Sequence, residues 1–226
     1  MLRAVIFDFD GVITDSEILH LRTFNEVLAQ YGIEIPTGDY YTEYLGSTDF
    51  DCFMVLSDKH GLGLDEQGIE NLVRQKNEIY EELAKTEGKI IEGVRGFLEM
   101  LKDNNVRMAI CSGSLLTEIE LLLDEAGLRN FFEAIVSAEE VKKFKPDPEG
   151  FLLALRKLNE KGLNLISAGE CIAIEDSHWG LEAARRAGMH TIAITNSYDA
   201  ERLASAEKTV DILTELTMSD LQELCE

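Results

Sequence analysis

The chain alternates short apolar runs with helical patterns, and this alternation limits the folds that it can adopt. Runs with the length of a strand lie at residues 3–8, 107–111, 134–137, 171–175, 190–194 and 210–213. Helical patterns lie between most of them, such as residues 115–126 and 177–187, each closed by a glycine of the kind that ends helices. We therefore expect an α/β fold, with a doubly wound, Rossmann-like parallel sheet at its core.

The interval between the first two apolar runs is too long for a single crossover helix. It contains stretches of helical character at residues 16–31, 50–60 and 65–85. We therefore expect a Rossmann-like core made of residues 1–15 and 91–226. A small α-helical cap domain, residues 16–90, would be inserted after the first strand.

The first apolar run ends in two aspartates separated by one residue, Asp8 and Asp10, followed by Gly11. Strand alternation points both carboxylates to one side, at the end of a strand where open α/β sheets bind ligands. Two like charges this close favour a hard divalent cation with oxygen ligands. A solvated turn is the alternative, because Asp and Gly are also common turn residues.

Three later segments place polar groups at or near the ends of other predicted strands. They are Ser112-Gly113-Ser114 after residues 107–111, Lys145 before a proline-fixed turn, and Glu175-Asp176 at the end of residues 171–175. Each segment has an ordinary explanation by itself: a helix cap, a surface lysine or a solvated acidic turn. Together, a hydroxyl, a cation and acids at successive strand ends are what a phosphate-plus-metal site requires.

These residues resemble the four motifs of haloacid dehalogenase-like phosphotransferases. The matching segments are Asp8 to Ser16, Ser112, Lys145-Pro146, and Glu175-Asp176-Ser177 with Gly180. The stretch from Glu175 to Met189 is also typical of the β-phosphoglucomutase-like branch. The resemblance spans nearly the whole chain in the family's order, and it implies a cap in the same place.

The resemblance also implies a mechanism. Asp8 is the expected nucleophile, forming an aspartyl-phosphate, and Asp10 the expected general acid and then general base. Mg²⁺ would bind the Asp8 carboxylate, the Asp10 main-chain carbonyl and Asp176, with Glu175 supporting or ligating the ion. Ser112 and Lys145 would hold the phosphoryl oxygens, together with Gly113 and Ser114 at the start of a helix.

The acceptor of the phosphoryl group is less constrained. His20 and Lys76 resemble cap residues of the mutase, and the resemblance implies that His20 orients Asp10 or contacts the substrate. Each also has an ordinary explanation as a structural or solvated helix residue. Mutase-like relatives carry an arginine in the cap to hold the non-reacting phosphate, and here the residue is Asp49. We therefore predict a phosphatase acting on a small phosphorylated metabolite, either a sugar phosphate or a phosphorylated organic acid. β-Phosphoglucomutase is the alternative, and a non-catalytic phosphate-binding protein is a more remote one.

Composition excludes several other classes of partner. The formal net charge of −22 argues against nucleic acid and against anionic membrane surfaces. No apolar stretch approaches the roughly 18 residues of a membrane span, and the first residues lack a signal-peptide layout. Four cysteines without metal-ligand spacing suggest buried, reduced thiols, so we expect a cytoplasmic protein. The sequence gives no evidence of a protein partner.

Overall fold

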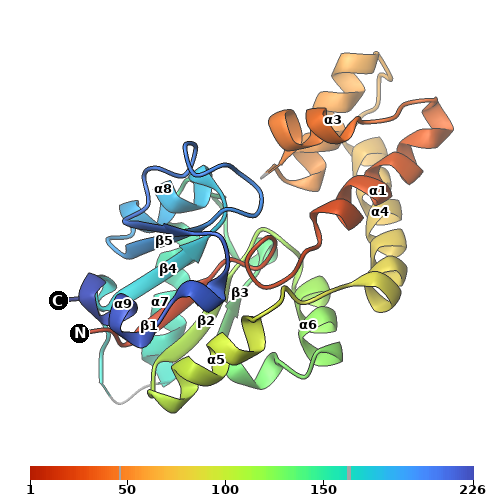
Figure 1. Ribbon diagram of the computed structural model, residues 1–226. Coiled ribbons are helices and arrows are strands. Elements are labelled where there is room, and N and C mark those ends of the chain that lie inside the picture. The colour runs from red at the N-terminus through yellow and green to blue at the C-terminus, as the bar shows by residue number, and fades with distance from the viewer. Residues whose placement is uncertain (46, 162–163) are drawn as a thin grey trace. The chain divides into compact units, whose positions relative to one another are not determined.

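The computed structural model describes residues 1–45, 47–161 and 164–226, which divide into two compact units (Figure 1). The core unit consists of residues 1–15 and 89–226, and the inserted unit consists of residues 16–88. Among the described residues, none of the helices has the length and apolar composition of a membrane span.

The described residues of the core unit form a six-stranded parallel sheet in the order β3-β2-β1-β4-β5-β6 (Figure 1). The strands are β1 (Ala4–Phe7), β2 (Arg107–Cys111), β3 (Ala134–Val136), β4 (Cys171–Glu175), β5 (His190–Ile194) and β6 (Lys208–Val210). The strand order changes direction at β1, which pairs with β2 on one side and β4 on the other. The loops after β1 and β4 therefore lie at the topological switch point, where such sheets bind ligands. The predicted doubly wound α/β fold is confirmed.

One predicted strand is wrong over most of its length. The apolar run at residues 210–213 contributes only Val210 to β6, where it pairs with Ile194. The next residue, Asp211, accepts a hydrogen bond of 2.6 Å from the Thr195 hydroxyl, and the chain then forms the short 3-10 helix η6 (Leu213–Glu215). Ile212 is exposed and Leu213 is buried, so these residues form a turn that packs on the core through Leu213 and do not continue the strand.

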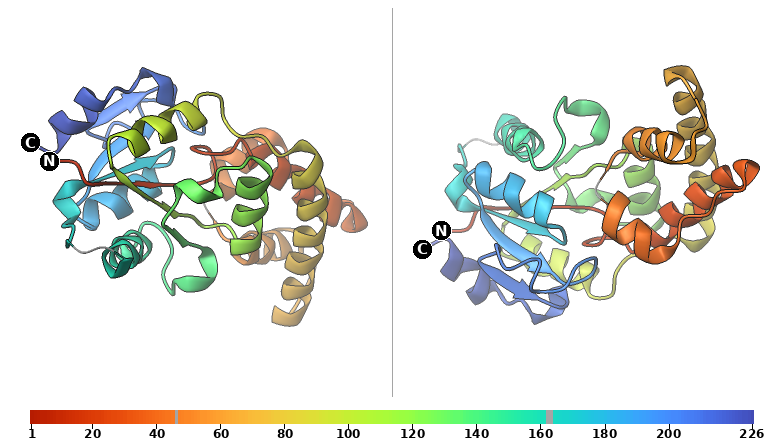
Figure 2. Two further views of the ribbon diagram at one scale, coloured as in Figure 1. Left: turned by 90° about the horizontal axis from the view of Figure 1, so that it is seen from below. Right: turned by 90° about the horizontal axis from the view of Figure 1, so that it is seen from above.

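Helices cover both faces of the sheet because strand residues alternate between the faces. The helices of the core unit are α5 (Val94–Asp103), α6 (Leu116–Glu125), α7 (Glu149–Lys161), α8 (His178–Arg186) and α9 (Met218–Leu224). Figure 2 shows α5 and α7 on opposite faces of the sheet. On the α5 face, the ring of Phe7 meets the ring of Phe97 edge-on, with centroids 6.1 Å apart.

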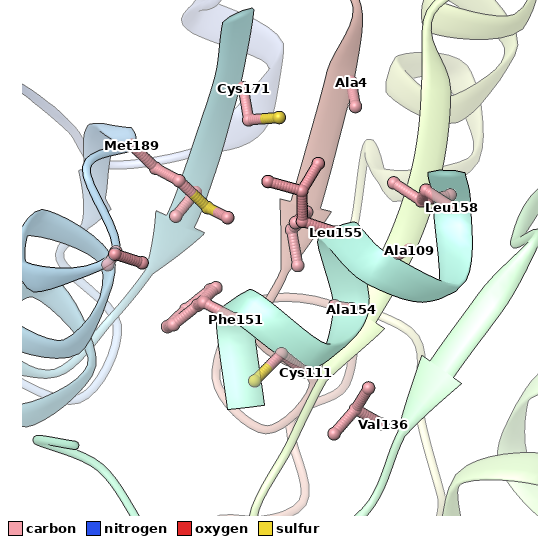
Figure 3. Packing of buried hydrophobic residues seen from close by; sticks show 14 of the residues in the cluster. Ala4, Ala109, Cys111, Val136, Phe151, Ala154, Leu155, Leu158, Cys171 and Met189 are labelled. Atoms are coloured by element: carbon pink, nitrogen blue, oxygen red, sulfur yellow. The ribbon is translucent and has the colours of Figure 1, made fainter. Parts of the chain in front are cut away.

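The opposite face carries the larger cluster of small and medium apolar side chains. Phe151 and Leu155 of α7 pack over Ala4 and Ala109 of the central strands (Figure 3). Alanines on the strands let the helix approach closely, which fixes the position of the loop that precedes α7. This packing matters for the site because Lys145 lies in that loop.

The inserted unit is helical. Its main helices are α1 (Glu17–Leu28), α3 (Asp49–His60) and α4 (Glu66–Glu87). The short elements η1 (Ala29–Tyr31), α2 (Thr37–Asp39) and η2 (Tyr40–Tyr44) lie between α1 and α3. Thr48 caps α3 by accepting a hydrogen bond from the Asp51 amide, and Asp65 caps α4 in the same way. A cluster of apolar side chains, including Phe24 and Phe53, gives this unit a core of its own.

Candidate active site

Three carboxylates meet at the carboxyl ends of β1 and β4. The amide of Asp8 donates a hydrogen bond of 2.9 Å to the Ile174 carbonyl, which places Asp8 beside the end of β4. One oxygen each from Asp8, Glu175 and Asp176 lies within 4.8 Å of the others, and all three residues are buried. The parallel pairing of the two strands therefore brings together acids that are far apart in the sequence.

Lys145 joins this cluster from the loop before α7. Its Nζ lies 2.6 Å from Oδ1 of Asp8 and 2.5 Å from Oε1 of Glu175. The same ammonium lies over the ring of Phe151, 5.4 Å from its centroid. Lys145 thus bridges two of the three acids, and a single positive charge faces three carboxyl groups.

Burial and crowding of like charges change the protonation of these groups. Burial raises the pKa of Asp8 to about 8; Lys145 opposes this shift, whereas Glu175 and Asp10 add to it. Burial also disfavours the charge of Lys145, but Asp8 and Glu175 outweigh that effect and raise its pKa well above the usual value. The cluster therefore holds a charged lysine beside an excess of acid.

This donor set fits a hard divalent cation. Such ions take carboxylate and carbonyl oxygens, and a bound cation would relieve the excess of acid over base. Two of the acids also accept hydrogen bonds from hydroxyl groups. Ser197 donates to Oδ2 of Asp176, and Ser177 donates to Oε2 of Glu175 at 2.9 Å. The acidic cluster could therefore bind a metal ion with its carboxylates already oriented.

Two glycines leave the space that the acids occupy. Gly11 has a φ of +76°, and a Cβ on it would lie 1.7 Å from Oδ2 of Asp176. A Cβ on Gly180 would lie 1.9 Å from the carboxyl carbon of Glu175. Any larger residue at either position would displace a carboxylate of the cluster, which explains why the sequence has glycine there.

The second aspartate, Asp10, contacts the residues that follow β2. Oδ2 of Asp10 accepts a hydrogen bond of 2.5 Å from the Ser114 hydroxyl, and the Ser112 hydroxyl lies 3.5 Å from the same oxygen. The structure thus brings the predicted acid–base residue together with two of the predicted phosphate-binding residues.

The main-chain amides at the start of α6 have partners in the chain. The Ser114 amide donates to Oγ of Ser112 at 2.9 Å, and the Leu115 amide donates to Oε2 of Glu118 at 3.0 Å. Glu139 accepts from the Leu116 amide at 2.9 Å. Of the predicted phosphate-binding amides before this helix, the Gly113 amide therefore remains the candidate.

The two predicted cap residues lie in the inserted unit, within one buried cluster. Lys76 Nζ lies 2.8 Å from Nδ1 of His20 and 2.8 Å from Oδ2 of Asp49. The ammonium also lies over the rings of Phe24 and Tyr80, and the His20 ring stacks on Tyr80 with centroids 4.3 Å apart. Asp49 is thus the ion-pair partner of Lys76.

Sequence reasoning missed two residues of the core site, Asn196 and Ser197. Both follow β5; Asn196 donates to the Gly11 carbonyl at 3.2 Å, and Ser197 donates to Asp176. The sequence signal that could have found them is their position as a polar pair just after the strand predicted at residues 190–194.

Comparison with known proteins identifies the family. Residues 5–194 match the haloacid dehalogenase-like hydrolases. The chain belongs to this family. The resemblance in the motifs is therefore confirmed.

Other members of the haloacid dehalogenase-like family match over nearly their whole length. The phosphorylated carbohydrates phosphatase of Thermotoga maritima is 29% identical over 99% of this chain and 100% of its own. The fructose-1-phosphate phosphatase YqaB of Escherichia coli is 29% identical over 84% of this chain and 95% of its own. Among solved structures, β-phosphoglucomutase from Clostridium difficile matches with a TM-score of 0.86 and 27% identity, over 100% of this chain and 97% of that one.

Proposed function

We propose that this haloacid dehalogenase-like hydrolase is a cytoplasmic, Mg²⁺-dependent phosphatase that hydrolyses a small sugar phosphate. One observation carries the proposal: Asp8 lies buried against Lys145 in a cluster of acids at the switch point of the sheet. A nucleophilic carboxylate, a cation for the phosphoryl oxygens and metal-binding acids are the groups that phosphoryl transfer needs. The four free, buried cysteines suit a reducing compartment.

Asp8 is the proposed nucleophile. Its carboxylate oxygen forms a bond to phosphorus while the bond from phosphorus to the ester oxygen breaks, and Asp10 gives a proton to the departing alcohol oxygen. Asp10 then takes a proton from water, whose oxygen attacks the aspartyl-phosphate and releases inorganic phosphate and Asp8. Lys145 and the Ser112 hydroxyl hold the phosphoryl oxygens during both steps.

The proposed metal ligands are Asp8, Asp176 and the main-chain carbonyl of Asp10, with Glu175 supporting them. When bound, Mg²⁺ neutralises charge that develops on the phosphoryl oxygens. Glu175 already accepts hydrogen bonds from Lys145 and Ser177, so we assign it to orienting Lys145 rather than to direct ligation.

The choice of a sugar phosphate rests on two kinds of support. Relatives of this chain are named for phosphorylated carbohydrates and for fructose 1-phosphate. In the inserted unit, we keep His20 and Lys76 as candidate substrate-binding residues. Asp49 cancels the charge of Lys76, which suits a substrate whose non-reacting part is an uncharged polyol better than a phosphorylated organic acid.

β-Phosphoglucomutase is the second candidate, because the Clostridium difficile enzyme of that name has a closely similar structure. A mutase must hold a second phosphate while the first reacts. Among the described residues of the inserted unit, Lys76 is the buried cation that could do so, and its ion pair with Asp49 weighs against that role.

A panel assay separates the two candidates. Purified protein is incubated with Mg²⁺ and a set of sugar phosphates and phosphorylated acids, and free phosphate is measured, with Asp8→Asn protein and a chelator as controls. We expect phosphate release from a sugar phosphate that disappears in both controls. Formation of glucose 6-phosphate from β-glucose 1-phosphate without free phosphate would establish the mutase instead. Normal turnover by Asp8→Asn protein would contradict the mechanism.

A further inference from the structure

We infer that Ser114 is a positioning residue for the acid–base group Asp10, rather than a ligand of the phosphoryl group. The inference rests on the proposed function, because it assigns a partner to the residue that protonates the leaving oxygen. It also gives different roles to two serines that the sequence does not distinguish: Ser112 binds the phosphoryl group, and Ser114 orients the carboxyl group of Asp10.

The contact that carries the inference is direct. The hydroxyl of Ser114 donates to Oδ2 of Asp10 at 2.5 Å, whereas the hydroxyl of Ser112 is 3.5 Å from that oxygen, at the limit of a hydrogen bond. Ser114 is only 9% exposed, so water competes poorly for its hydroxyl. A short bond to a carboxylate from a buried hydroxyl is among the stronger hydrogen bonds in proteins.

The main chain on both sides of that hydroxyl is held in place. The Ser114 amide donates to Oγ of Ser112 at 2.9 Å, and the Ser114 carbonyl accepts from the Ala138 amide at 3.0 Å. The Ser112 amide in turn donates to the Val136 carbonyl at 2.9 Å, which continues the pairing of β2 with β3. Ser114 therefore presents its hydroxyl from a rigid segment, as a residue that fixes another side chain must.

The two hydroxyls differ in what they have left to donate. Oγ of Ser112 accepts the Ser114 amide, and a hydroxyl that accepts one bond keeps its own proton for a phosphoryl oxygen. The single proton of Ser114 is already directed at Asp10. The geometry thus gives each serine one task.

Fixing Asp10 matters for one part of the reaction. As Asp8 bonds to phosphorus and the ester bond breaks, the electron pair of that bond goes to the ester oxygen, which takes the proton from Asp10. A sugar alkoxide is a poor leaving group and needs that proton. A p-nitrophenolate is a good leaving group and departs without it.

The experiment compares two esters across three variants. Ser114→Ala, Ser112→Ala and Asp10→Asn proteins are assayed with fructose 1-phosphate and with p-nitrophenyl phosphate, and kcat/KM is measured because it reports the step in which the leaving group departs. The inhibition constant of inorganic phosphate is measured for each protein. Thermal unfolding and circular dichroism of each variant establish that it is folded.

We expect Ser114→Ala to lower kcat/KM for fructose 1-phosphate by about 10- to 100-fold, part of the roughly 10²- to 10⁴-fold that general acid catalysis supplies. With p-nitrophenyl phosphate the loss stays below about 3-fold, and phosphate inhibits as in the wild type. Asp10→Asn shows the same dependence on the leaving group, and adding Ser114→Ala to it causes no further loss. The matched control, Ser112→Ala, weakens phosphate inhibition and affects both esters alike.

Equal losses on the two esters, or weaker inhibition by phosphate in Ser114→Ala protein, would overturn the inference and make Ser114 a phosphate ligand or a structural residue. In that outcome the wild type still releases phosphate, so the proposed function stands. Wild-type protein that hydrolyses neither p-nitrophenyl phosphate nor any sugar phosphate of the panel overturns both.

Discussion

The two units each contain a lysine in an ion pair, and the partners of the two lysines differ. In the core unit, Lys145 contacts Asp8 and Glu175, and Asp176 belongs to the same cluster. In the inserted unit, the side chain of Lys76 is 1% exposed and contacts one carboxylate, that of Asp49. Lys76 also contacts an imidazole nitrogen and two aromatic ring faces.

This difference separates a cluster with an excess of acid from one in which the positive and negative charges are paired. Around Lys145 the acids outnumber the base, and burial has already raised the pKa of Asp8. A bound metal cation would balance the charge of that cluster. Around Lys76 one charge meets one charge, and the aromatic faces add further stabilisation to the cation. We expect the first cluster to govern activity and the second to govern the stability of the inserted unit.

The largest expected effect is on activity. Lys145→Met should lower kcat for p-nitrophenyl phosphate by about 10³-fold or more, because it removes the cation that faces the phosphoryl oxygens and leaves buried acids unpaired. Lys76→Met should change the same rate by less than about 10-fold. Lys143→Met, which removes an exposed lysine two residues from Lys145, is the control. Similar losses in the two buried-lysine variants would remove the distinction between the clusters.

The second effect is on stability and comes from the ion pair between Lys76 and Asp49. Lys76→Met leaves the Asp49 carboxylate without its ion pair and should lower the free energy of unfolding by about 3 kcal/mol, near the lower end of the range for broken buried pairs, because the Asp49 side chain is 25% exposed. Urea denaturation of both single variants and of the double variant with Asp49→Asn measures the coupling. Strict additivity of the two single effects would contradict a direct pairing.

The third effect is stabilisation by metal. Mg²⁺ at about 30 times its dissociation constant should stabilise the protein by about 2 kcal/mol, which shifts the melting temperature by several degrees. Asp176→Asn should abolish this shift, and Asp49→Asn should leave it unchanged. A Mg²⁺-dependent shift that survives in Asp176→Asn protein would place the ion elsewhere.

The fourth effect is a pH dependence of the metal-free protein. The pKa of Asp8 is raised from 3.8 to about 8, so the folded state keeps a proton that the unfolded chain releases over that interval. The contribution of Asp8 to the free energy of unfolding is therefore fully present below about pH 4 and is lost as the pH rises toward 8. Urea denaturation in a chelator, at several pH values, should show the wild type losing stability relative to Asp8→Asn protein. A constant difference between the two would contradict the raised pKa.

The sequence was sufficient for the parts of the fold that depend on local pattern. Strands β1, β2 and β4 are apolar runs buried on both faces, and the carboxyl ends of adjacent parallel strands must meet. That rule groups Asp8 with Glu175 and Asp176 once β4 is known to pair with β1, and the local pattern does not show that pairing. The prediction of a strand at residues 210–213 failed because most of these residues form a turn packed on the core. An apolar run of this length does not distinguish such a turn from a strand.

Contacts between side chains on different elements could not be predicted. Lys76 and Asp49 lie on separate helices, and neither has a sequence signal that names the other as its partner. Ser114 follows Ser112 by two residues, yet only the direction of its hydroxyl distinguishes a residue that fixes Asp10 from one that binds phosphate. Ser197 lies in a loop without periodicity, so its bond to Asp176 depends entirely on the fold.

The most direct test of the central claim, that Asp8 carries the phosphoryl group, is to look for the group on that residue. Asp10→Asn protein is mixed with Mg²⁺ and p-nitrophenyl phosphate, whose leaving group departs without a proton from Asp10, and the mixture is quenched in acid, digested and analysed by mass spectrometry. Loss of the general base should then let the intermediate accumulate. We predict one phosphoryl group on the peptide that contains Asp8, and none in protein that also carries Asp8→Asn. A wild-type enzyme that releases phosphate while no peptide of Asp10→Asn protein is phosphorylated, or a phosphoryl group on any residue other than Asp8, would contradict the proposed mechanism.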